Sequence, residues 1–385
     1  MRKSTRAAVL AAACALLCSA NAPAAIPFTF GFYAPGANNG ITDVPGVQVG
    51  HVTKIEGAGV RTGATVVLAN NDPWNRKVSA SAFAFNGNGE MTGTHWINES
   101  GYLETPIVLT DTLDVGRADD GAITWMMRRY PEIGKTDDVP LPVVAECDDQ
   151  LLNDITGRHV TATDVVGAID SAHAGEFERG SVGAGTGMKA FGFKSGIGSA
   201  SRMLPADLGG YTVGVLVNDN TGSTREQLTI DGVHVGAALR GQYRMTFPKR
   251  ISLHGRMASG SIVVIVATDA PLDSRQLHAI ALRASLGMGR TGLTSDVGSG
   301  DLFLAFSTGH VFARTGNFRV SAPGTSIITS DDILDALYRA TAEATEGAIY
   351  DALFSAKTMT GRGGATVYGL PVDRVLQMLK RKELQ

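Results

Sequence analysis

A serine flanked by two glycines stands directly before an apolar stretch of the chain. The segment reads Gly298-Ser299-Gly300, and the apolar run 302–306 that follows it is typical of a buried strand. Glycines on both sides leave the backbone free to adopt uncommon geometry and let a second group approach the serine hydroxyl. Because the same pattern also forms ordinary turns, the motif alone does not identify Ser299 as a catalytic residue.

The sequence lacks the motifs of several other classes of enzyme. The eight histidines show no His-Glu-x-x-His spacing and no local pairing with acids, which disfavours a zinc site. The Gly-x-Ser-x-Gly elbow of α/β-hydrolases does not occur. A loose Gly-x-Gly-x-x-Ala match at 183–190 follows a polar segment and precedes further glycines, whereas a dinucleotide loop joins a strand to a helix. Nucleotide binding is therefore disfavoured as well.

Alternating apolar runs and helical stripes indicate the elements that must position the serine. Seven short apolar runs bounded by Gly, Asn or Asp predict buried strands: Ala64–Ala69, Ser79–Phe85, Pro106–Leu109, Val143–Ala145, Tyr211–Val217, Ser261–Ala267 and Leu302–Phe306. Apolar periodicity and capping residues predict helices at Thr163–Ala174, from Asp273, at Ser330–Ser355 and at Val372–Lys380. Strands dominate the first three hundred residues, so we expect sheets layered with helices in one domain.

Composition narrows the class of protein. The 385 residues are 44% hydrophobic and carry a net charge of −3 without a basic block, which argues against nucleic-acid binding. Residues 1–25 have the charged start, short apolar run and small-residue cleavage pattern of a secretory signal. We therefore expect a periplasmic or secreted protein that leaves the membrane after the signal is removed. Cys147 is the only cysteine beyond this segment, so no intrachain disulfide is expected.

Ordered motifs along the whole chain resemble one known family. They are Ile41-Thr-Asp-Val-Pro-Gly-Val-Gln-Val-Gly-His51, Asn86-Gly-Asn-Gly-Glu90, Pro106-Ile-Val-Leu-Thr-Asp-Thr112, Lys194-Ser-Gly-Ile-Gly-Ser-Ala-Ser-Arg202, Gly298-Ser-Gly-Asp301 and Thr358-Met-Thr-Gly-Arg362. Together they are similar to the DmpA-like self-processing aminopeptidases, which include the L-aminopeptidase/D-esterases and the β-peptidyl aminopeptidases. The resemblance implies a four-layer α-β-β-α sandwich of the N-terminal-nucleophile type, a homotetramer, and no metal or organic cofactor.

In this family the chain cuts itself before a serine, which here implies autocleavage between Gly298 and Ser299 into segments 26–298 and 299–385. The cut would free an α-amino group on Ser299. Because a terminal amine has a pKa near ~7.7, it can serve as the base for the hydroxyl of its own residue. One residue would then supply both nucleophile and base, and no histidine is required.

The resemblance also implies three supporting residues. Asn220 matches the family's oxyanion donor, with Asn218 as second choice, although both amides could simply end a strand. Glu146 matches the acid that binds the free amine of the substrate. Glu346 matches an acid in the family's Ser-x-Glu-Glu run on a late helix. The chain departs from that run at Ala344 and Gly347, which leaves Thr345 or a water to supply the missing hydroxyl.

The sequence thus predicts an exported serine aminopeptidase that hydrolyses N-terminal residues from small peptides, amides or esters through an acyl-enzyme on Ser299. Two alternatives remain at this point. The first is an amide hydrolase or acyltransferase of the same fold. Ser299 argues against it, because those relatives use threonine as the nucleophile. The second is an exported binding protein without catalysis, which the changes at Ala344 and Gly347 would suit.

Overall fold

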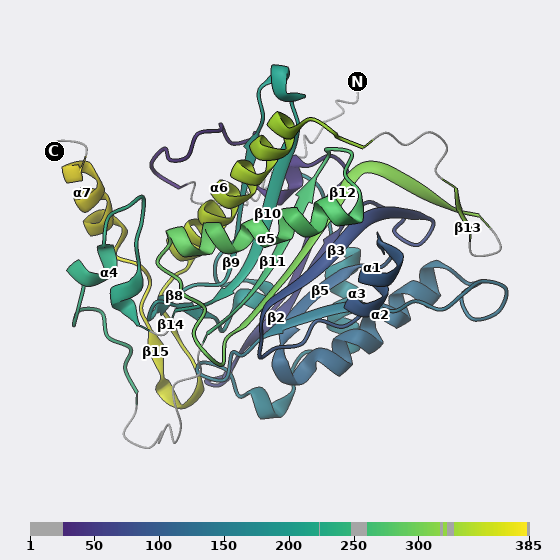
Figure 1. The fold of residues 1–385 in the computed structure, drawn as a ribbon. Helices are drawn as coiled ribbons and strands as arrows, with labels where there is room; N and C mark the ends of the chain where they lie inside the picture. Colours follow the sequence, from purple (N-terminus) through teal and green to yellow (C-terminus); the bar gives the residue numbers. More distant parts are fainter. Residues whose placement is uncertain (1–25, 223, 248–259, 316–318, 322–326, 383–385) are drawn as a thin grey trace, which may run out of the picture.

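A computed structural model describes residues 26–222, 224–247, 260–315, 319–321 and 327–382. The predicted signal segment lies outside this range. Two β-sheets stack face to face, and each carries helices on its outer face (Figure 1). This is the four-layer α-β-β-α arrangement expected from the sequence. No helix in the described part of the chain is long and apolar enough to cross a bilayer.

The smaller sheet has four strands in the order β1-β2-β5-β6, which span Gln48–Glu56, Val60–Leu68, Ile107–Asp111 and Val143–Cys147. Helices α2 (Val115–Arg129) and α3 (Ala162–Asp170) cover its outer face. Apolar side chains of β2, β5 and β6 form a core with these helices that includes Val66, Val108 and Val144. Because residues alternate along each strand, their neighbours Val67, Leu109 and Ala145 face the other sheet.

The larger sheet contains the candidate nucleophile. Six of its strands run in the order β4-β3-β12-β11-β10-β9. In this order they span Tyr102–Leu103, Arg76–Gly87, Gly300–Thr315, Ser261–Thr268, Thr212–Asn220 and Ile197–Met203. The seventh strand, β13 (Arg319–Ser321), pairs with the far end of β12. Strand β12 begins one residue after Ser299. It pairs antiparallel with β3 and parallel with β11, so the start of β12 lies beside the end of β3.

Two helices cover the outer face of the larger sheet. Helix α5 (Ser274–Arg290) begins with the predicted capping box: the Asp273 side chain accepts from the Gln276 N–H at 2.7 Å, and the Gln276 side chain accepts from the Asp273 N–H at 3.2 Å. Helix α6 (Asp331–Ser355) begins after Ser330, as expected, although this serine makes no side-chain cap. Smaller elements complete the chain: α1 (Thr94–Ser100), α4 (Val235–Ala238), α7 (Val372–Lys382), and the short strands β7 (Lys189–Ala190), β8 (Phe193–Lys194), β14 (Met359–Thr360) and β15 (Thr366–Val367).

The structure contains elements that the sequence patterns did not predict. Strand β9 consists mainly of small residues, and Gly198 lies so close to α6 that a Cβ there would be 2.0 Å from the Ala348 carbonyl oxygen. Helix α2 carries two glycines and two adjacent aspartates, which obscure its apolar face. Strand β1 was also missed, and α3 ends at Asp170 rather than at Ala174. For β9, packing against α6 outweighs weak local propensity.

Candidate active site

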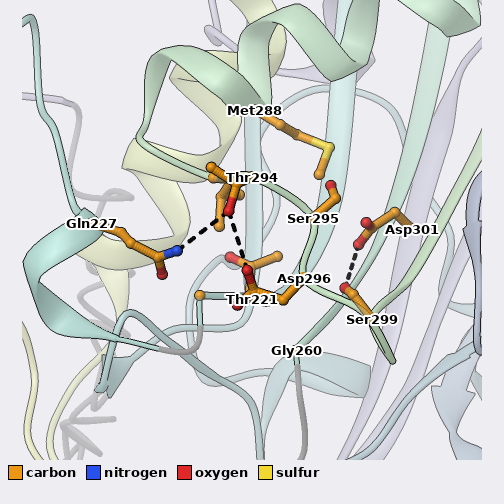
Figure 2. Close-up of a pocket in the computed structure, with 11 residues that line it drawn as sticks. Thr221, Gln227, Gly260, Met288, Thr294, Ser295, Asp296, Ser299 and Asp301 are labelled. Carbon is orange, nitrogen blue, oxygen red and sulfur yellow. Dashed lines mark hydrogen bonds between the residues drawn. The ribbon is translucent and has the colours of Figure 1, made fainter.

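The candidate nucleophile Ser299 is buried at the start of β12, with 5% of its surface exposed. Its Oγ hydroxyl donates a 2.7 Å hydrogen bond to Oδ1 of Asp301 (Figure 2). Its N–H donates to the Asp296 carbonyl at 2.9 Å. Burial raises the pKa of the Asp301 carboxyl above its ordinary value. The serine hydroxyl therefore already has an acceptor in the uncut chain, and this acceptor is a more basic carboxylate than usual.

The peptide bond before Ser299 is held by the loop that follows β3. The Asn88 side chain donates from Nδ2 to the Gly298 carbonyl at 2.7 Å, and the Asn88 N–H donates to the Ser299 carbonyl at 3.3 Å. Gly298 adopts φ +91°, a conformation that favours glycine. A Cβ at Gly300 would lie 2.4 Å from the Asn88 carbonyl oxygen, so only glycine permits this approach.

A small pocket adjoins the Ser299 hydroxyl on the helical side of the sheet. Its walls come from the loop after β10, from α5, from the segment before the serine and from the start of β12 (Figure 2). They include Thr221, Gln227, Met288, Leu293, Thr294, Ser295, Asp296 and Asp301. The cavity measures about 10 Å³, which is on the order of one water molecule. An amino-acid residue does not fit while residues 293–296 occupy this wall.

Glu146 lies at the end of β6 and is 5% exposed. Its Oε1 accepts a 3.0 Å hydrogen bond from the Glu90 N–H, and Oε2 accepts from the Thr112 hydroxyl. Burial raises the pKa of this carboxyl, whereas the two hydrogen bonds act in the opposite direction. A Cβ at Gly89 would lie 3.1 Å from Oε1 of Glu146 and 3.5 Å from Cα of Gly300. The structure thus brings the candidate acid close to the serine loop.

The two candidate oxyanion donors lie on β10. Asn220 donates from Nδ2 to the Asp148 carbonyl at 2.9 Å and to the Ser261 hydroxyl at 3.2 Å. In the sheet Asn220 pairs with Ser261 and Ser261 pairs with Gly300, so strand alternation puts Asn220 and Asp301 on opposite faces. Since the Ser299 hydroxyl binds Asp301, the Asn220 amide does not face that hydroxyl in the uncut chain.

Asn218 is fully buried, and its amide has no hydrogen-bond partner among the described residues. Its backbone carbonyl accepts a weak hydrogen bond of 3.5 Å from the thiol of Cys147, the residue after Glu146. An unpaired buried amide is costly, which keeps Asn218 a candidate for binding a polar group.

Glu346 lies on α6, and its carboxylate is bound at both oxygens. Arg290 at the end of α5 donates at 3.2 Å, and the Tyr350 hydroxyl, one turn later on the same helix, donates at 2.8 Å. These bonds hold the Glu346 carboxylate at the contact between the two helices, and its role toward Ser299 stays a prediction. The Thr345 hydroxyl donates to the Thr341 carbonyl at 2.8 Å, so it is bound within its own helix.

Packing accounts for one departure from the family pattern. A Cβ at Gly347 would lie 2.8 Å from the Phe30 ring and 2.9 Å from the Ala200 methyl group. A glutamate at this position would require both neighbours to move. The close contact of α6 with Phe30 and β9 therefore explains why position 347 is glycine rather than the family's second glutamate.

Asn88, Thr112 and Asp301 lie within the motifs of the sequence, but the motifs alone predict no role for them. Strand alternation could have identified Asp301, because a residue two positions after Ser299 shares its face. The contact of Asn88 with Gly298 spans 210 positions, and only the pairing of β3 with β12 reveals it. Among the described residues, no group of three or more His, Cys, Asp or Glu side chains has the geometry to hold a metal ion.

Comparison with known proteins places this arrangement in a family. The β-peptidyl aminopeptidase BapA of Sphingosinicella microcystinivorans is 41% identical over 365 residues, which cover 90% of this chain and 89% of that protein. The solved structure of a Burkholderia sp. β-aminopeptidase has a TM-score of 0.82 at 41% identity, covering 92% of this chain and 96% of that one.

A third relative is the L-aminopeptidase D-Ala-esterase/amidase of Ochrobactrum anthropi, described as a prototype for the serine aminopeptidases and a variant of the Ntn hydrolase fold. Its structure has a TM-score of 0.80 at 39% identity and covers 93% of this chain and 97% of that one. These likenesses favour neither the acyltransferase nor the binding-protein interpretation of the sequence. The profile of peptidase family S58 matches residues 39–367, and the chain belongs to this family.

Proposed function

We propose that the protein is a self-processing serine aminopeptidase that hydrolyses N-terminal residues from small peptides, amides or esters through an acyl-enzyme on Ser299. The observation that carries the proposal is the environment of the 298–299 bond. A buried serine hydroxyl is hydrogen-bonded to a carboxylate, and the carbonyl before it is held by an amide side chain. The relatives whose names describe serine aminopeptidases and β-aminopeptidases support the same conclusion.

The uncut chain is a zymogen under this proposal. Residues 293–296 form one wall of the small pocket and leave no room for a substrate residue. Cleavage at 298–299 frees the end of this segment, so it can move away from the serine. The same cut releases the α-amine of Ser299, which has a pKa near ~7.7 and takes the proton of the hydroxyl at neutral pH.

Turnover then uses the side chains around the new N-terminus. The Glu146 carboxylate binds the ammonium group of the substrate by a charge-assisted hydrogen bond. The Ser299 hydroxyl attacks the carbonyl of the first residue, and the leaving amine departs with a proton from the Ser299 α-amino group. Asn220 stays on its face of the sheet, and the freed Ser299 terminus turns toward it, so that the Asn220 amide donates to the oxyanion. Water then releases the acyl group.

Two further features belong to the proposal. We infer export to the periplasm or medium through the segment 1–25, and assembly into a homotetramer, both supported by the sequence pattern and the family resemblance. Light scattering of the purified protein measures the assembly. Fractionation of cells that express the full chain measures export.

A panel of p-nitroanilides carrying L-α-, D-α- or β-amino acids tests the activity and defines its substrate class, because the named relatives include both β-peptidyl and L-amino acid enzymes. Processed wild-type protein is expected to release p-nitroaniline from at least one class, and Ser299→Ala from none. Release only from substrates with a blocked amine would contradict an aminopeptidase.

A further inference from the structure

The uncut chain holds the 298–299 bond between two groups that the turnover machinery does not use. Asn88 donates to the Gly298 carbonyl oxygen at 2.7 Å, and Asp301 accepts from the Ser299 hydroxyl at 2.7 Å. The two bonds therefore contact the atoms that react when the hydroxyl attacks the carbonyl. The Gly298 carbonyl oxygen becomes an oxyanion, and the Ser299 hydroxyl loses its proton. The role of these two contacts in self-cleavage rests on the self-processing proposed above.

We propose that Asn88 is the oxyanion donor and Asp301 the general base of the self-cleavage reaction, as distinct from Asn220 and the Ser299 amine, which act in turnover. The terminal amine cannot be the base for the first cut, because it is still part of the peptide bond. Asn220 does not serve as donor in the uncut chain, because its amide lies on the opposite face of the sheet. The self-cleavage therefore needs its own donor and base.

The reaction balances with these groups. Asp301 takes the proton from Oγ as the Oγ–C bond to Gly298 forms, and Asn88 donates to the resulting oxyanion. When the intermediate collapses, the C–N bond breaks and Asp301 returns the proton to the nitrogen of Ser299. The product is an ester between Gly298 and the Ser299 hydroxyl. Water hydrolyses this ester and leaves a carboxylate on Gly298.

The backbone around Asn88 is built for this contact. Its N–H binds the Ser299 carbonyl at 3.3 Å while its side chain binds the Gly298 carbonyl, so one residue holds both sides of the bond. Gly300 is required for the approach, since a Cβ there would collide with the Asn88 carbonyl oxygen. Burial also raises the pKa of the Asp301 carboxyl, which makes it a stronger base than an exposed aspartate.

Asn86 provides a matched control. It lies two residues earlier, at the end of β3, and donates from its amide to the Asp296 carbonyl at 2.9 Å rather than to the 298–299 bond. If Asn88 merely held the loop, removing either amide would have a similar effect. If Asn88 stabilises the oxyanion, its removal slows cleavage far more, because loss of one such donor typically costs ~10²–10³ in rate.

The test is the cleavage rate of freshly synthesised full-length chain, followed by intact mass in wild type, Asn88→Ala, Asn86→Ala and Asp301→Asn. Cleavage is expected to slow by about 10²–10³ in Asn88→Ala and by less than about tenfold in Asn86→Ala. Asp301→Asn is expected to slow it at least as much as Asn88→Ala, with an unchanged circular dichroism spectrum as the check on folding.

Equal rates in Asn88→Ala and Asn86→Ala, or wild-type cleavage in a folded Asp301→Asn, would overturn the inference while leaving the proposed function in place. A wild-type chain that never cleaves would overturn both.

Discussion

The carboxylate of Glu146 accepts a 3.0 Å hydrogen bond from the backbone N–H of Glu90, two residues after the asparagine that holds the Gly298 carbonyl. The loop after β3 therefore contacts both the candidate acid for the substrate amine and the bond before the nucleophile. The acid and the serine come from different sheets, and this loop sets the distance between them.

Glu146→Gln is expected to weaken substrate capture but not self-cleavage, because only the substrate carries a free amine. A charge-assisted hydrogen bond contributes about 1.5–3 kcal/mol, so kcat/KM should fall on the order of 10–100-fold. Steady-state kinetics on the processed protein measure this loss, and intact mass measures processing. An equal slowing of processing and capture would remove Glu146 from the amine-binding role.

Thr112→Val is expected to move the acid limb of kcat/KM to higher pH. The Thr112 hydroxyl donates to Glu146 and favours its charged form, so its loss raises the pKa of that carboxyl further above its ordinary value. Since the ionised carboxylate binds the substrate ammonium, activity is lost at a higher pH as the solution is acidified. A pH profile with the limb in its wild-type position would contradict the assignment.

Substitutions at Asn220 and Asn218 separate the two candidate donors for turnover. Asn220→Ala is expected to lower kcat of the processed enzyme by about 10²–10³ with little change in KM, as for other lost oxyanion donors. Asn218→Ala is the matched variant on the same strand and should leave most of kcat in place. The reverse ranking would assign the oxyanion to Asn218.

Two buried carboxylates that have no proposed catalytic role predict how stability depends on pH. Asp111 and Asp149 are nearly or fully buried, and burial together with neighbouring aspartates raises the pKa of each. The folded state thus retains protons that the unfolded chain releases, and the free energy of unfolding falls as pH rises from about 5 to about 8.

Asp149→Asn should flatten this dependence, because an amide does not titrate and can still accept from Asn153, which donates to Asp149 at 2.9 Å. Urea unfolding at several pH values gives the slope. An unchanged slope in the variant would show that Asp149 is not one of the responsible groups.

Much of the fold could be predicted from the sequence. Each of the seven apolar runs lies within a strand except for at most one residue at one end, because glycine and aspartate mark where a buried run ends. Strand β9 is not predicted from the sequence because it lacks a run of large apolar residues. Small residues are needed there, since α6 packs so closely on Gly198 that no side chain fits between them. A pattern along one segment does not record which neighbour will cover it.

The site was predicted less completely. Ser299 and Glu146 could be found from motifs, but Asn88 contacts the scissile carbonyl only because β3 pairs with β12 across more than two hundred residues. The expected role of Glu346 in positioning the amine of Ser299 stays a prediction, and the structure adds that Arg290 and Tyr350 bind its carboxylate. Side-chain contacts of this kind depend on tertiary packing, which residue types and spacing do not specify.

The most direct measurement is the intact mass of the purified full-length protein, taken alongside its aminopeptidase activity. Two associated polypeptides are expected, the smaller beginning at Ser299 and ending at Gln385, and Ser299→Ala should give one unbroken, inactive chain. A single intact chain that still releases amino acids would contradict the mechanism, because the base would then not be the amine of Ser299.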